Sequence, residues 1–110
     1  MKVDKKGHTT IIRNTQYPTA EFLQKLTHEY NSYKNQNLII DLSHDKAITM
    51  ADVKLFSDMI KLHKKEKKSL VLVVNDIDFK KKKKNIVLVP TLLEAHDIIE
   101  IDEIERDLGF

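Results

Sequence analysis

The five histidines are the residues of this chain best suited to metal binding or proton transfer: His8, His28, His44, His63 and His96. No two of them have the H-x-H or H-x-x-x-H spacing that brings two imidazoles onto one zinc ion. The chain has no cysteine, which excludes disulfides and a cysteine-based zinc site. We therefore expect no metal and no cofactor, and interpret the histidines as surface or boundary residues.

The consecutive residues Ser43, His44 and Asp45 have the side chains of a hydrolase triad. In a working triad the nucleophile, base and carboxylate converge through hydrogen bonds, which three neighbours on a loop rarely do. Ser43 and Asp45 are also typical of turns, in which their side chains bind nearby backbone amides. The sequence therefore predicts a turn here, and a protein without a catalytic site.

Two lysine runs are candidates for polyanion binding. If the strands expected at 69–74 and 86–89 are parallel, their connection must return the chain to the starting edge of the sheet. The second run would then end near the first, and the joint patch could bind RNA or another polyanion through phosphate contacts. No aromatic platform or known nucleic-acid motif accompanies the lysines, so a solvated surface is the competing interpretation. The runs comprise Lys64, Lys65, Lys67 and Lys68, and Lys80, Lys81, Lys82, Lys83 and Lys84.

The last part of the chain has the opposite charge. From Pro90 onward seven acidic residues accompany one basic residue, Arg106, so this part carries −6 while the remainder carries +8. An acidic helix that packs on the sheet with its charges in water is one interpretation. Complementarity between copies, or with a basic partner, is the other. Two apolar stripes on the expected helix favour an interaction surface: Leu92, Ala95 and Ile99 form one, and Ile98, Ile101, Ile104 and Leu108 the other.

The composition indicates the class of protein to which these residues belong. The 110 residues are 41% hydrophobic, enough for one domain, 1–110, with a real core. No apolar run approaches the roughly 18 residues of a membrane span. The start of the chain lacks the apolar core of a signal peptide. We expect a cytoplasmic protein.

Periodicity predicts alternating strands and helices. The β-branched, apolar runs at 38–40 and 69–74 predict buried strands, and 86–89, Thr9–Asn14 and a short stretch at Lys2–Asp4 predict three more. Helical spacing predicts helices from Thr19 to about 34, from Thr49 to the first lysine run, and at 91–108. Alternation of this kind predicts an α/β fold with a mostly parallel sheet of four to five strands in sequential order.

The sequence also predicts one helix cap and the residues of the hydrophobic core. Thr49, followed by Asp52 three residues later, predicts a capping box at the start of the second helix. The hydrophobic core is expected to consist of Ile11, Leu38, Ile40, Val53, Phe56, Ile60, Leu70, Leu72, Val87 and Leu92.

The centre of the chain resembles a STAS domain, the fold of anti-sigma-factor antagonists. The resemblance rests on LIIDLS at 38–43, on Ile48-Thr49 before a helix, and on KKSLVLV at 67–73. In that family a D-L-S-like triplet leads to a D-S-S-G-like helix start, whose serine a partner kinase phosphorylates. Here Asp41, Leu42, Ser43 and Ile48 agree, Thr49 stands at the aspartate, Met50 and Ala51 stand at the serines, and Asp52 replaces the glycine.

The resemblance implies a STAS-like, non-catalytic regulatory or protein-interaction module without a working phosphoserine switch. Thr49 and Ser43 remain as hydroxyls that a kinase could modify. The implied partner-facing surface is the loop and the following helix start: Ser43, His44, Asp45, Thr49, Met50, Lys54 and Ser57. We expect a monomer or weak homodimer with a protein partner and no membrane association.

An RNA-binding accessory protein that uses the lysine runs is the alternative. Similar short bacterial chains sometimes carry the name ribonuclease Z, which would link this alternative to RNA processing. That enzyme resembles a metallo-β-lactamase, with an H-x-H-x-D-H loop and a much longer chain. Only His44-Asp45 is similar to the loop, so the name would not describe an activity of this chain.

Overall fold

The fold is built around a five-stranded sheet with strand order β1-β2-β3-β4-β5. The computed structural model describes residues 1–75, 77–79 and 85–109. Strands β2 (Thr9–Arg13), β3 (Asn37–Asp41), β4 (Leu70–Val73) and β5 (Leu88–Val89) are parallel, and β1 (Lys2–Lys6) pairs with β2 in the antiparallel sense. The predicted mostly parallel sheet in sequential order is confirmed.

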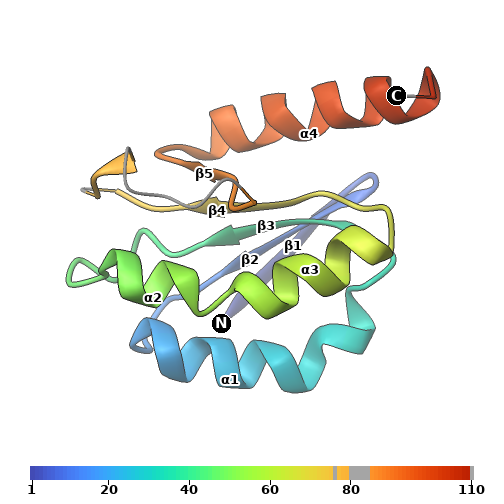
Figure 1. Cartoon of the computed structure of the whole chain (residues 1–110). Helices are drawn as coiled ribbons and strands as arrows, with labels where there is room; N and C mark the ends of the chain where they lie inside the picture. Colours follow the sequence, from blue (N-terminus) through green and yellow to red (C-terminus); the bar gives the residue numbers. More distant parts are fainter. Residues whose placement is uncertain (76, 80–84, 110) are drawn as a thin grey trace.

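Helices cover both faces of this sheet (Figure 1). On one face lie α1 (Thr19–Glu29), a short 3-10 helix at Tyr30–Ser32, α2 (Met50–Lys54) and α3 (Ser57–Lys65). On the other face lies α4 (Leu92–Asp107) alone. Among the described helices, none combines the length and the apolar character that crossing a bilayer requires.

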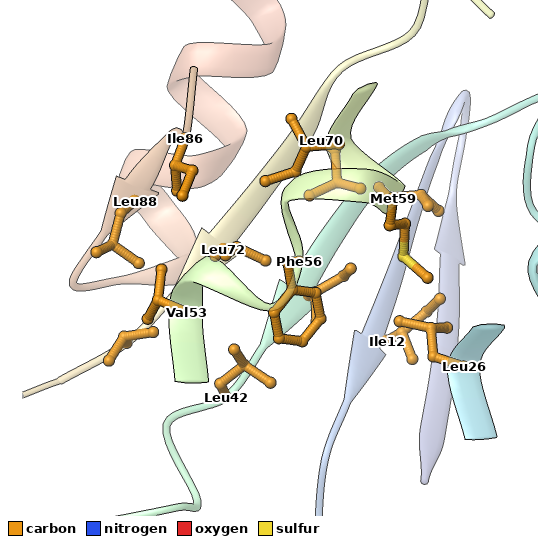
Figure 2. Packing of buried hydrophobic residues seen from close by; sticks show 14 of the residues in the cluster. Ile12, Leu26, Leu42, Val53, Phe56, Met59, Leu70, Leu72, Ile86 and Leu88 are labelled. Carbon is orange, nitrogen blue, oxygen red and sulfur yellow. The ribbon is translucent and has the colours of Figure 1, made fainter. Parts of the chain in front are cut away.

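The strands divide the core into two hydrophobic clusters, because successive side chains of a strand point to opposite faces. Leu38 and Ile40 point toward α1–α3, where they pack with Phe22, Leu26 and Phe56. Figure 2 shows Phe56 and Leu72 within this larger cluster. The smaller cluster lies beneath α4 and contains Ile11, Ile39, Val71, Val73, Val89, Ala95 and Ile99.

Eight of the ten expected core residues are buried, and two are not. Val87 and Leu92 are only half-buried. Their neighbours Ile86 and Leu88 are buried in the larger cluster instead. The regular strand β5 contains only two residues, Leu88 and Val89, so Val87 lies before it, and both Val87 and Leu92 pack at the margin of the smaller cluster.

The second helix is also different from the prediction, because it is divided in two. Leu55 and Phe56 separate α2 from α3, and the amide of Phe56 donates to the carbonyl of Val53 in a tight turn, 3.1 Å. Val53, Phe56 and Ile60 are all buried nevertheless. The division therefore changes the helix path but preserves its inner face.

The N-terminal strand β1 lies at one border of the sheet. All five of its residues, Lys2–Lys6, are exposed, so it extends further than the predicted Lys2–Asp4 and buries none of its side chains. The turn to β2 contains Gly7 with φ +59, a left-handed conformation that glycine adopts without a steric penalty. This glycine thus permits the tight connection between β1 and β2.

Candidate functional site

The loop between β3 and α2 begins at the carboxyl end of a central parallel strand, where α/β folds usually bind ligands and partners. Asp41, the last residue of β3, fixes the first part of this loop. Its carboxylate accepts hydrogen bonds from the Ser43 amide at 3.0 Å and the Ser43 hydroxyl at 2.6 Å. The Arg13 side chain of the neighbouring strand donates to the same carboxylate, with Nε 3.1 Å from Oδ2.

Asp45 fixes the middle of the loop by binding the start of α1. Its Oδ2 accepts from the Thr19 hydroxyl at 2.7 Å and from the Thr19 amide at 3.1 Å, while Oδ1 accepts from the Ala47 amide at 3.0 Å. The residue before α1, Pro18, provides no side-chain cap. Asp45 therefore supplies the acceptor that the helix N-terminus needs, from a loop 26 residues later in the chain.

These contacts favour the charged form of Asp45. The hydrogen bond from the Thr19 hydroxyl lowers the pKa of the Asp45 carboxyl most, and the backbone amides of Thr19 and Ala47 and nearby His44 lower it further against the opposing effect of burial. The carboxylate thus remains ionised at neutral pH.

The end of the loop is fixed by the predicted capping box. The Asp52 amide donates to Thr49 Oγ1 at 3.3 Å, and the Thr49 amide donates to Asp52 Oδ2 at 3.0 Å. The Thr49 hydroxyl also donates to Asp52 Oδ2, 3.2 Å away. The loop is therefore attached at its start, middle and end.

An open depression of about 620 Å³ lies between this loop and the connection from β2 to α1; we call it the loop depression. Tyr17 lies on the β2–α1 side, with the Lys25 ammonium 4.6 Å from the centre of its ring. His44 and Lys46 are exposed on the other side. The full lining is Gln16, Tyr17, Pro18, Thr19, Ala20, His44, Asp45, Lys46, Ala47 and Asp52.

The expected partner-facing residues differ in exposure. His44, Thr49 and Lys54 are exposed, whereas Ser43 and Asp45 are half-buried and bonded within the protein. Met50 is half-buried against the larger core cluster, as a hydrophobic cover.

Ser57 is less accessible than the partner-facing surface implied by the resemblance requires. It is half-buried, and its hydroxyl oxygen is buried with no hydrogen-bond partner among the described residues. Ser57 is the first residue of α3 and lies directly after the buried Phe56.

Sequence reasoning did not select Tyr17 or Lys46, which line the loop depression. Tyr17 belongs to a connection 24 residues before Asp41, and no residue spacing indicates that the two connections lie side by side. The order of the elements offers the one available signal. Both connections follow parallel strands, and the carboxyl ends of parallel strands lie at one edge of the sheet.

The described lysines of the first run surround the end of α3. Lys67 adopts φ +59, an uncommon left-handed conformation for a residue with a side chain, at the point where the helix ends. Lys64, Lys67, Lys68, Arg106 and Gly109 line an open depression of about 470 Å³. Asn85 lines an adjoining depression together with Lys64 and Lys68. The second run, Lys80–Lys84, lies outside the described residues.

Arg106 is attached to the end of the sheet beside these lysines. Its guanidinium donates to Ser69 Oγ at 3.1 Å and to Asn37 Oδ1 at 3.2 Å. The Ser69 hydroxyl in turn donates to Asp102 Oδ2 at 2.7 Å. This network connects α4 to β3 and β4, so Arg106 combines a structural role with its place in the basic depression.

His63 differs from the surface or boundary histidine that the sequence suggested. It is fully buried, with Nδ1 2.7 Å from the Tyr30 hydroxyl and Nε2 2.8 Å from the Gln36 carbonyl. A carbonyl only accepts, so Nε2 carries the proton and Nδ1 accepts from Tyr30. Burial lowers the pKa of His63 and keeps the ring neutral.

The described residues contain no group of three His, Asp or Glu side chains that could hold a metal ion. Asp45, the orienting residue of the apparent triad, is bonded to Thr19 and Ala47. The Ser43 hydroxyl donates a hydrogen bond to the Asp41 carboxylate. The three consecutive residues therefore form the predicted turn.

Comparison with known structures identifies the fold of this chain. No family model and no curated protein matches the sequence. A chain from the stressosome, a signal integration and transduction hub, is similar in structure, with a TM-score of 0.58 and 12% identity over 90% of this chain and 96% of that chain. The sheet order, the helices on its two faces and this likeness together show that the chain has the STAS-like fold.

Proposed function

We propose that this protein is a non-catalytic regulatory module that binds a protein partner through the loop depression and the adjoining start of α2. The observation that carries the proposal is the Asp45–Thr19 link. It holds two connections together and presents His44 and Lys46 on a surface that is ordered before binding. A preorganised surface loses less conformational entropy when a partner binds.

The same loop favours constitutive binding over a phosphorylation switch. The Ser43 hydroxyl is bonded to Asp41, and the Thr49 hydroxyl to Asp52. A phosphate on either oxygen would break a hydrogen bond and place negative charge beside a carboxylate. Met50 and Ala51, at the resembling serine positions, offer no hydroxyl.

The test is partner capture from native lysate with a matched pair of variants. His44→Glu combined with Lys46→Glu reverses the exposed charge of the loop depression. His28→Glu combined with Lys61→Glu makes the same change at exposed positions of α1 and α3. We expect the first pair to lose a partner that wild type and the second pair retain, with all three proteins folded by circular dichroism.

Equal retention of every partner by both pairs would refute the loop surface. The absence of a switch has its own measurement, intact-mass and peptide mass spectrometry of the natively expressed protein. Stoichiometric phosphate on Thr49 or Ser43 would overturn constitutive binding without affecting the docking site.

A second candidate function is polyanion binding at the lysine depression. The supporting observation is that Lys64, Lys67 and Lys68 of one run lie with Arg106 around one hollow. Asn85, directly after the second run, lines the adjoining hollow. Replacing the three lysines by serine should weaken binding of a fluorescent single-stranded RNA and flatten its salt dependence. An equal effect from replacing Lys2, Lys5 and Lys6 would reject a specific patch.

A further inference from the structure

The outer face of α4 exposes more apolar surface than the core requires. Ala95 and Ile99 face the sheet and are buried. On the opposite face Leu93 is 72% exposed, Ile101 55%, Ile104 53% and Leu108 67%. With 3.6 residues per turn these four side chains fall within an arc of about 80°. We call them the α4 stripe.

Acidic residues lie on both sides of the α4 stripe, and one lies within its arc. Every acidic residue of this group is exposed, and none forms an ion pair with a lysine or arginine among the described residues. Arg106, the only lysine or arginine of the helix, faces inward to Ser69 and Asn37. Glu94 and Glu105 lie on one side of the stripe, Glu100 and Asp107 on the other, and Asp97 between Leu93 and Ile101.

We propose that the α4 stripe is a docking surface for a basic amphipathic helix of a partner protein. An apolar stripe between acidic borders is complementary to a helix with apolar residues at i, i+3, i+4 and i+7 and with lysine or arginine beside them. From Leu93 to Leu108 the stripe is about 22 Å long at 1.5 Å per residue, which suits about four turns of a partner helix.

Charge decides between this partner and a second copy. Symmetric packing of two α4 helices would bring the acidic borders of both copies together, and like charges at an interface oppose association. Because the whole chain carries +2, a cationic helix gains no general attraction. Its binding must depend on the local charge of α4.

The two proposed surfaces belong to different faces of the molecule. The loop depression lies beside α1 and α2, whereas α4 covers the opposite face of the sheet (Figure 1). Both can be occupied at once, so the module would join two proteins. The α4 proposal does not depend on the loop proposal.

The test uses a defined probe, a fluorescein-labelled peptide of about 18 residues that places leucines on one helical face and lysines on the other. Fluorescence anisotropy measures its affinity for the full chain. We expect saturable binding that weakens when ionic strength rises from about 0.1 M to about 1 M, since the Debye length falls from about 10 Å to about 3 Å. A scrambled peptide of equal composition should not bind.

Two variants test the apolar part of the surface. Ile101→Ser with Ile104→Ser should weaken the peptide about tenfold, which corresponds to about 1.4 kcal/mol. Leu55→Ser with Leu62→Ser is the matched control, because those leucines are 50% and 52% exposed on the other face of the sheet. The control should bind as wild type does.

Two further variants test the charges. Asp97→Lys with Glu100→Lys should weaken the peptide about tenfold, equivalent to about 1.4 kcal/mol. Glu21→Lys with Glu29→Lys makes the same charge change at exposed positions of α1 and should have little effect. Equal losses in the paired variants, or equal binding of the scrambled peptide, would overturn the proposal.

Analytical ultracentrifugation of the protein alone addresses the second copy. We expect no association that depends on α4. A dimer of wild type that Ile101→Ser with Ile104→Ser dissociates would overturn the proposal and assign the stripe to self-association. Because the substituted side chains are exposed, all variants should unfold at the same urea concentration as wild type.

Discussion

Removal of the Asp45 carboxylate tests the link between the two loops most directly. Asp45→Ala deletes three hydrogen bonds, two from Thr19 and one from Ala47. Loss of a helix N-cap alone costs about 1 kcal/mol. Hydrogen bonds to a charged acceptor contribute about 1.5–3 kcal/mol when buried, and less at a half-exposed position such as this. We expect a total loss of about 2 kcal/mol.

Urea unfolding followed by circular dichroism measures this loss. With a slope of about 2 kcal/mol per molar, the midpoint should fall by about 1 M. His44→Ala, a change at the exposed neighbouring residue, is the control and should leave the midpoint nearly unchanged. Since the Asp45 pKa is lowered in the folded protein, its contribution is present above the unfolded value of 3.8 and is lost as pH falls through the folded pKa.

A double-mutant cycle isolates the contact between the two loops. Thr19→Val removes the hydroxyl that donates to Asp45 at 2.7 Å and retains a β-branched side chain. Combined with Asp45→Ala, it should reveal a coupling energy of about 1 kcal/mol. Additive effects, with no coupling, would refute the idea that this hydrogen bond holds the loops together.

Three further predictions concern the core, the end of α3 and the buried histidine. Phe56→Ala, at a fully buried position, should lower the free energy of unfolding by about 3–5 kcal/mol in urea titrations; a loss below about 1 kcal/mol would contradict the packing in Figure 2. Lys67→Gly should raise the thermal midpoint, with a gain of roughly 0.5–1 kcal/mol, because glycine adopts φ +59 without strain; Lys65→Gly, inside the helix, should lower it. Burial holds the pKa of His63 below its ordinary 6.5, so its contribution to stability is full above pH 6.5 and declines as pH falls toward the folded pKa. His63→Gln should reduce that dependence, and an unchanged slope of stability against pH would count against the buried neutral ring.

The central strands could be predicted from sequence because their apolar runs are unambiguous. Leu38–Ile40 lies between polar residues, the run from Leu70 to Val74 lies between Ser69 and Asn75, and both runs are buried on both faces of the sheet. The capping box at Thr49 was equally predictable, since it depends on two residues three positions apart. Both features depend on residues close together in the sequence, so the sequence pattern itself predicts them.

Features that depend on distant residues could not be predicted in this way. Nothing before Thr19 or around Asp45 indicates that a carboxylate 26 residues later caps α1. The division of the second helix at Leu55 and Phe56 has no proline or glycine to mark it.

The charged residues of β1 affect how this protein can associate with other proteins. A strand at the border of a sheet presents unpaired amides and carbonyls, to which foreign strands can add. Here that strand has the sequence Lys-Val-Asp-Lys-Lys, and all five residues are exposed. Its concentrated charge opposes strand addition and aggregation next to the apolar strands β2–β4. At the other border β5 offers only two residues. Within residues 1–75, 77–79 and 85–109, association through extended backbone is therefore disfavoured at both borders of the sheet.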